Sequence, residues 1–233
     1  MIDRYTLIAS TEQLRSAFDF LENMSSFDNQ YNAAPSKKMP VTTLEKPNQV
    51  QWLQWGFMSS FSNNKKMSPK LFNAEIVQSV SKPSTKKSLS KNRCAIYATG
   101  FFLWKLVSKK TLTPYYVHLR SGQPFVIGGF WEEKDEFVEN SEDSFMMLTR
   151  SASNDLREYQ EDMPFIVPKN KVIEWLHPEF EIDQSLDWLD LDYNEPFSIY
   201  PVSPAINQVE LNDERLIRRT LPADQHGNYT LFG

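Results

Sequence analysis

The sequence predicts an α+β fold built around antiparallel strands. Three apolar runs, rich in aromatic and β-branched residues as buried strands are, lie close together at Cys94–Trp104, Tyr115–Leu119 and Phe125–Trp131. Turn-forming residues separate them at Lys109–Pro114 and Ser121–Gly122. Because glycine readily adopts the positive φ of a tight turn, Ser121–Gly122 predicts a hairpin. We therefore expect a three-stranded antiparallel core on which the rest of the chain packs.

The N-terminal part predicts strands and one amphipathic helix. Residues Asp3–Ala9 are typical of a strand, and Ser10, with Gln13 three positions later, is a good helix N-cap. Apolar residues recur at helical spacing after this cap, at Leu14, Phe18 and Leu21. Two further strands are expected at Pro40–Leu44 and Gln51–Phe57.

The C-terminal half alternates between short helices and strands. Strands are expected at Phe145–Thr149 and Phe197–Val202, and helices at Ser153–Tyr159, Lys169–His177 and Gln184–Leu191. Residues Gln78–Asn92 contain five serines and four lysines, which predicts an exposed, flexible loop at 78–92. We expect one domain over residues 1–210, followed by a polar and partly disordered tail over residues 211–233.

The composition excludes several classes of protein. With 233 residues, of which 40% are hydrophobic, the chain can bury one substantial core. No apolar run is long enough to cross a membrane, and the first residues do not resemble a signal peptide. The single cysteine, Cys94, cannot form an internal disulfide and is expected to be a small buried residue. These features favour a cytoplasmic protein with no membrane partner, which we expect to be a monomer.

Charge is unevenly distributed along the chain. The net charge is −5, yet residues 61–110 carry eleven lysines and arginines against Glu75 alone. Residues 132–195 carry nineteen acidic residues against five basic ones. This polarity would give one face that can meet phosphate groups and another that repels them. The alternative is that both segments are simply solvated surface.

The sequence predicts neither a metal nor a cofactor. The three histidines (His118, His177 and His226) lack the spacing of metal ligands, and Cys94 has no partner in a C-x-x-C motif. The glycine pair Gly128-Gly129 is not part of a phosphate-binding loop.

A set of short motifs, in a fixed order, resembles the SRAP family (SOS-response-associated peptidases, or abasic-site processing proteins). The motifs are YNAAPS at 31–36, WG at 55–56, FNAE at 72–75, RC…GFFLWK from 93 to 105, GGFWE at 128–132, and VSPAIN at 202–207. The resemblance implies a single domain whose mostly antiparallel strands form an open barrel with peripheral helices.

The resemblance also implies a chemistry that this chain has partly lost. Family members capture the aldehyde of an abasic site in single-stranded DNA with the amine and thiol of an N-terminal cysteine, and a glutamate and a histidine move protons. This chain has Ile2, Leu103 and Gln160 at those positions. None of these side chains is a nucleophile or a titratable acid or base near neutral pH. Asn32 is the retained residue of the expected catalytic set, although an asparagine there also suits a turn.

For DNA binding, the resemblance implies contacts from Arg4, Asn32, Trp55 and Asn73. Two family arginines are acidic here, at Glu75 and Asp162, which removes two cations; the one at position 75 meets the DNA backbone in the family. A tryptophan such as Trp55 can stack on a nucleobase, but it is more commonly part of the core.

Three hypotheses for function remain open. The first is a catalytically inactive, SRAP-like module that binds single-stranded or abasic DNA without a covalent bond. The second is an active enzyme of the family type, a lyase or crosslinker, that uses the Met1 amine to form a Schiff base. The third is a module that binds a protein or a small ligand.

Overall fold

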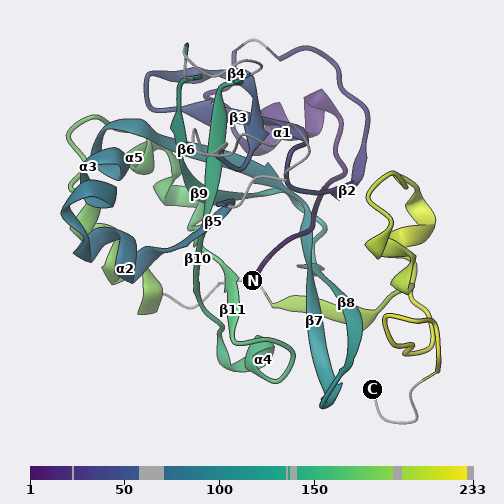
Figure 1. Ribbon diagram of the computed structural model, residues 1–233. Helices are drawn as coiled ribbons and strands as arrows, with labels where there is room; N and C mark the ends of the chain where they lie inside the picture. The colour runs from purple at the N-terminus through teal and green to yellow at the C-terminus, as the bar shows by residue number, and fades with distance from the viewer. Residues whose placement is uncertain (23, 58–70, 135, 137–140, 191–195, 230–233) are drawn as a thin grey trace.

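The computed structural model describes residues 1–22, 24–57, 71–134, 136, 141–190 and 196–229 (Figure 1). Within these residues the strands form two sheets. The five-stranded sheet has the order β13-β8-β7-β1-β2, with β1 (Tyr5–Leu7), β2 (Gln30–Ala33), β7 (Gly100–Ser108), β8 (Thr111–Leu119) and β13 (Phe197–Pro201). The eight-stranded sheet has the order β11-β10-β4-β3-β6-β9-β12, with β5 beside β10. Its strands are β3 (Lys38–Thr43), β4 (Lys46–Trp55), β5 (Asn73–Glu75), β6 (Arg93–Ala98), β9 (Phe125–Glu132), β10 (Ser144–Ser151), β11 (Asp162–Pro164) and β12 (Ile166–Val167).

The larger sheet curls into a ring of strands. Strand β10 pairs with β9 on one side and, over Ser144–Phe145, in parallel with β4 on the other. The strands β4, β3, β6, β9 and β10 therefore follow one another around the ring, and most neighbours are antiparallel. The predicted α+β class, with mostly antiparallel strands and helices outside, is confirmed.

The predicted three-stranded core is wrong in its pairing. The apolar run Cys94–Trp104 is two strands that divide at Thr99, with β6 in the larger sheet and β7 in the smaller one. Gly122 does close a turn, with φ of 71° and a bond from its amide to the Leu119 carbonyl. However, β8 and β9 belong to different sheets, so the turn does not make a hairpin. Both edges of β9 are already paired, with β6 on one and with β10 and β12 on the other.

Helix α1 (Thr11–Ala17) begins where the sequence predicts. Ser10 and Gln13 form a reciprocal capping box, in which the Ser10 hydroxyl accepts from the Gln13 amide at 3.2 Å. The Gln13 side chain in turn accepts from the Ser10 amide at 2.7 Å. Leu14, Phe18 and Leu21 are all buried, but the helix ends at Ala17, so only Leu14 of the predicted helical face lies within it.

The predicted flexible loop at 78–92 is also wrong, because these residues are helical. Helix α2 (Ile76–Ser81) is capped by Glu75, and α3 (Pro83–Asn92) begins at a proline, the residue best suited to a first helical position. Most of the few apolar side chains here face inward: Ile76, Val80 and Leu89 are buried, while Val77 is exposed. The serines and lysines lie mainly on the outer surface, which is why the composition resembled that of a loop.

A buried arginine joins the helices to the larger sheet. Arg93 is fully buried and donates to the carbonyls of Leu89 and Ser90 in α3 and of Trp175 and His177 at the end of α5 (Val172–Trp175). Burial lowers the pKa of Arg93 to about 10, so it keeps its charge at neutral pH. The remaining short helices are α4 (Asn154–Arg157), η1 (Lys169–Lys171) and η2 (Ile182–Asp190).

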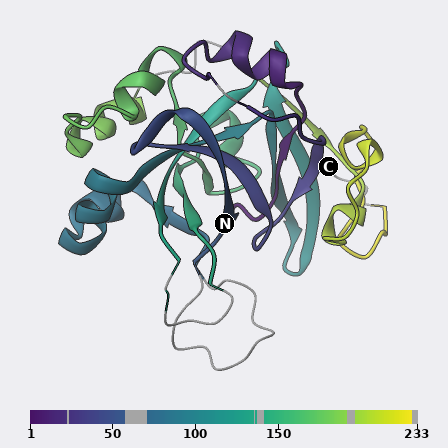
Figure 2. The ribbon, with the colours of Figure 1, turned by 90° about the horizontal axis from the view of Figure 1, so that it is seen from above.

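The C-terminal residues pack against the smaller sheet. Figures 1 and 2 show them beside β8, away from α2 and α3. The turns η3 (Pro204–Asn207) and η4 (Glu214–Ile217) bury Ile206 and Leu216 in a second apolar cluster that also contains Phe102 and Tyr116. As far as residue 229, the predicted disordered tail is therefore an ordered segment. Apolar residues at wide spacing in a polar stretch anchor it.

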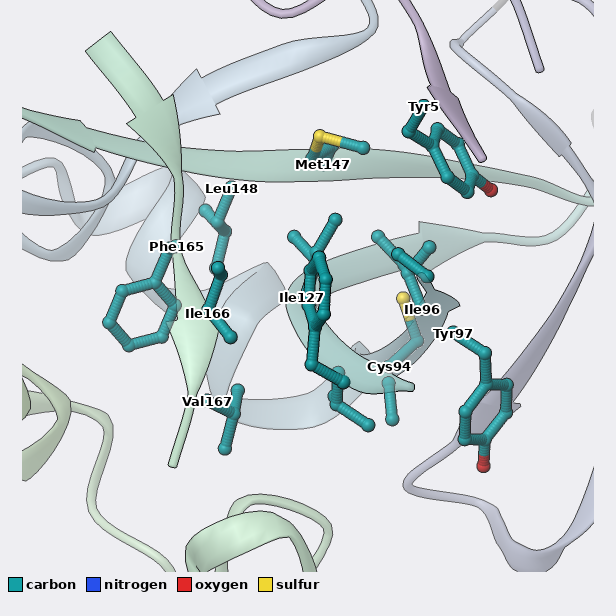
Figure 3. Packing of buried hydrophobic residues seen from close by; sticks show 14 of the residues in the cluster. Tyr5, Cys94, Ile96, Tyr97, Ile127, Met147, Leu148, Phe165, Ile166 and Val167 are labelled. Atoms are coloured by element: carbon teal, nitrogen blue, oxygen red, sulfur yellow. The ribbon is translucent and has the colours of Figure 1, made fainter. Parts of the chain in front are cut away.

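Apolar side chains fill the space between the strands. Figure 3 shows Cys94 among side chains such as Ile96 and Ile127, and burial raises the pKa of its thiol. Cys94 is thus the buried residue that the sequence predicts. No helix in the described part of the chain is long and apolar enough to span a membrane.

Candidate functional site

The N-terminus, β7 and β11 meet at one place. The α-amine of Met1 lies 2.7 Å from Asp162 Oδ1. The side-chain amide of Gln160 donates to the same carboxylate at 2.8 Å, and its oxygen accepts from the Trp104 amide at 3.1 Å. The structure therefore brings residue 160 close to both the N-terminus and the strand that carries Leu103.

The other two substituted positions are apolar and closed to solvent. Ile2 and Leu103 are fully buried members of the main core. An isoleucine, a leucine and a glutamine side chain can fill space and hold a hydrogen bond, but they cannot take up or release a proton near neutral pH. These three positions offer packing and orientation only.

Asn73, rather than Asn32, lies beside residue 2. The Asn73 amide donates to the Ile2 carbonyl at 2.5 Å. The Asn73 Oδ1 is buried and has no hydrogen-bond partner among the described residues. The FNAE motif contains this asparagine, but sequence reasoning assigned it only to DNA contact.

Asn32 has a different set of partners. Its side-chain amide faces the carbonyls of Gln208 at 3.0 Å, Leu211 at 3.1 Å and Ile206 at 3.3 Å. Asn32 is buried, so it fastens the C-terminal segment to β2. These contacts do not include residue 2, and the catalytic role of Asn32 remains a prediction.

Trp55 cannot stack on a nucleobase in this structure. It is fully buried, its indole donates to the Phe72 carbonyl at 2.9 Å, and its ring packs parallel to that of Phe145. Of the two options for Trp55, burial in the core is therefore correct. A large aromatic side chain that faces the core gains more from burial than from exposure.

Arg4 is partly neutralised by its neighbour. Its guanidinium donates to the Asp3 carbonyl at 2.6 Å and lies 3.4 Å from the Asp3 carboxylate. Only 11% of the side chain is exposed, and Arg4 Nε has no partner among the described residues. Its contact with DNA remains a prediction.

Both acidic replacements have structural partners. Glu75 accepts from the Gln78 amide at 2.7 Å and caps α2. Asp162 holds the Met1 amine, as described above. These carboxylates stabilise local structure where the sequence had suggested only the loss of two cations.

The basic segment is only partly near this site. Residues 61–70 lie outside the described residues, and Lys86 pairs with Asp183 at 2.6 Å. Lys82 lines a groove of about 590 Å³ together with Asn73 and Glu75. Lys105 lies on β7, two residues beyond Leu103.

Within the described residues, no group of three or more His, Cys, Asp and Glu residues is arranged to hold a metal ion. The contacts at the N-terminal site thus involve the Met1 amine, the Asp162 carboxylate and the side-chain amides of Gln160 and Asn73.

Comparison with known proteins decides the family. The family model described as SOS response associated peptidase (SRAP) matches residues 1–209. The chain belongs to the SRAP family. Among curated SRAP relatives, the abasic site processing protein YobE of Bacillus subtilis is 26% identical over 215 residues, covering 91% of this chain and 98% of YobE. The protein YoaM of the same organism, also named an abasic site processing protein, is 25% identical and covers 93% and 97% of the two chains.

Solved structures show the same SRAP fold. A protein from Bacteroides thetaiotaomicron superposes with a TM-score of 0.77 at 20% identity, covering 94% of this chain and 99% of that one. A phage-related protein from Bordetella bronchiseptica gives a TM-score of 0.65 at 19% identity, covering 86% and 93%.

Proposed function

We propose that this SRAP protein binds single-stranded DNA at abasic sites without a covalent bond. The curated relatives are named abasic site processing proteins, and this chain spans nearly their whole length. One observation carries the proposal. Positions 2 and 103 hold buried apolar side chains and position 160 holds a glutamine that bonds to Trp104 and Asp162, and none of the three can act as a nucleophile, acid or base.

The site retains features that suit recognition. The groove that Asn73 lines offers amide, hydroxyl and ammonium donors, beside the carboxylates of Glu75 and Glu132. Hydrogen-bond donors of this kind position a nucleic-acid backbone.

The test is one oligonucleotide run on two kinds of gel. Single-stranded DNA with one abasic site is mixed with the protein and separated first under native conditions and then after heating in detergent. We expect a retarded band in the native gel and free DNA in the denaturing gel. A band that survives heat and detergent would overturn the proposal of non-covalent binding.

A second candidate uses the Met1 amine. The amine is largely exposed and lies 2.7 Å from Asp162 Oδ1. A primary amine can condense with the aldehyde of a ring-opened abasic site, releasing water and forming an imine. Asp162 could accept the proton released on addition. Borohydride would reduce this imine to a stable amine, so a DNA adduct that requires borohydride would favour this candidate.

The third alternative, a module for a protein or small ligand, becomes the preferred function if neither gel shows an interaction with DNA.

A further inference from the structure

Lys105 faces the same side of β7 as Leu103. Side chains alternate along a strand, so residues 103 and 105 point to one face and are separated by roughly 7 Å. The neighbouring residue Trp104 is the one bonded to Gln160. Lys105 is therefore one strand repeat away from Leu103, on the strand whose Trp104 amide contacts the N-terminal site.

Two tyrosines hold the Lys105 ammonium. Its Nζ lies 5.1 Å from the ring centre of Tyr159 and 5.9 Å from that of Tyr115. The two rings are themselves in contact, with centres 4.7 Å apart. Burial raises the pKa of both phenols, so the rings remain neutral and add no negative charge. Cation–π contacts of this kind fix an ammonium in place without using its hydrogen bonds.

The Lys105 ammonium retains unused hydrogen-bonding capacity. Its nearest carboxylate oxygen, Glu158 Oε2, is 3.5 Å away, and the Glu158 side chain is 63% exposed. By contrast, the Met1 amine has a carboxylate oxygen at 2.7 Å. An ammonium has three donors, and within the described residues no standard hydrogen bond from Lys105 is formed.

Lys105 is also more enclosed than an ordinary surface lysine. Only 21% of its side chain is exposed, whereas Lys109 and Lys110, at the turn between β7 and β8, are exposed. A pre-positioned cation loses little conformational entropy when it binds an anion.

We propose that Lys105, held by Tyr115 and Tyr159, is a phosphate-binding residue for the DNA strand that enters the N-terminal site. This inference deepens the proposed function and rests on it. The anion is a phosphodiester of single-stranded DNA, placed one strand repeat from Leu103. Glu158 is the internal group that phosphate displaces.

The proposal predicts how DNA binding by the Lys105→Gln variant depends on salt concentration. Binding of a fluorescent, single-stranded abasic oligonucleotide is measured by anisotropy at several salt concentrations. Lys105→Gln should weaken binding about 3- to 10-fold at low salt. It should also make the slope of log affinity against log salt shallower by about 0.7, because each phosphate contact on a single strand contributes about that amount. The matched control is Lys109→Gln, which removes an equal charge from the exposed turn and should leave the slope unchanged.

Two further variants guard against loss of folding. Lys105→Arg should restore the slope, and Glu158→Gln should strengthen binding because it removes the competing carboxylate. If the wild-type protein does not bind, the proposed function fails and this inference fails with it. If the wild-type protein binds but Lys105→Gln behaves like Lys109→Gln and Glu158→Gln has no effect, Lys105 is not a phosphate ligand, while the proposed function stands.

Discussion

At the scale of single residues, the phenol of Tyr116 connects three strands of the smaller sheet. Tyr116 lies on β8, and its hydroxyl is 2.9 Å from the Thr6 hydroxyl on β1. Between them runs β7, where Gly100 leaves room for the ring. A Cβ at position 100 would lie 2.4 Å from the Tyr116 hydroxyl oxygen. Glycine is therefore required at position 100, because the Tyr116 side chain approaches its backbone closely.

Replacing that glycine should destabilise the sheet. Gly100→Ala pushes the Tyr116 ring away and overpacks the face, so we expect a loss of about 2–3 kcal/mol in the free energy of unfolding. Urea denaturation followed by tryptophan fluorescence measures it. Tyr116→Phe is the matched control, because it removes the hydroxyl without adding volume, and it should cost about 1 kcal/mol. Equal costs for the two variants would show that the close approach is not the constraint.

Sequence reasoning identified which residues belong to the site better than it identified the contacts that those residues make. Motif order assigns Ile2, Leu103 and Gln160 to the site, and in the structure Gln160 contacts the carboxylate that holds the Met1 amine. Sequence reasoning could not show that Asn73 bonds to residue 2, because nothing local says which asparagine faces it. Trp55 illustrates the same limit, since only the tertiary structure shows that its ring is enclosed.

At the scale of elements, Asn32 acts as a clamp on the C-terminal segment. One buried amide faces three carbonyls of residues 206–211, which belong to a segment with little regular structure of its own. Carbonyls in such a segment need partners when they are turned away from water.

Removing the Asn32 side chain should loosen the C-terminal segment without unfolding the ring of strands. For Asn32→Ala we expect faster amide hydrogen exchange over residues 204–217, because the segment can then open locally. The strands β6 and β9 should exchange at the wild-type rate. Mass spectrometry of deuterated peptides gives both rates from one experiment. A uniform increase across the molecule would instead mean that Asn32 supports the whole fold.

Elements with explicit end signals were the predictable ones. Helix α1 has its capping box in the sequence, and the structure confirms it. Helices α2 and α3 were missed because serines and lysines, which usually indicate a loop, cover their outer surface, while the inward residues are few. The turn residues did not show which strands pair. Gly122 determines that the chain changes direction, but it does not determine which sheet the next strand joins.

At the scale of the whole molecule, the division at residue 210 is still a prediction, and deletion tests it. A chain that ends at residue 210 loses Leu216 and exposes Phe102 and Tyr116, which Leu216 packs against. We expect a loss of about 2–3 kcal/mol in the free energy of unfolding, the amount that burial of a large apolar side chain contributes. We also expect the shortened chain to bind a hydrophobic dye.

The control for this deletion is Arg218→Gln, which changes an exposed charge in the same segment and should leave stability within about 0.5 kcal/mol of the wild type. If the shortened chain is as stable as the full one, residues 1–210 form an independent domain.

The passage of the chain from β6 to β7 through Thr99 has a mechanical consequence. One backbone supplies a strand to each sheet without an intervening loop, so tension applied to either sheet is transmitted directly to the other. Thr99 is buried and bonded to Thr6 and Ile8, which stiffens this crossing point. Cleavage of the peptide chain at Thr99 would thus weaken both sheets together. Cleavage at the exposed Lys109–Lys110 turn would disturb only the smaller sheet.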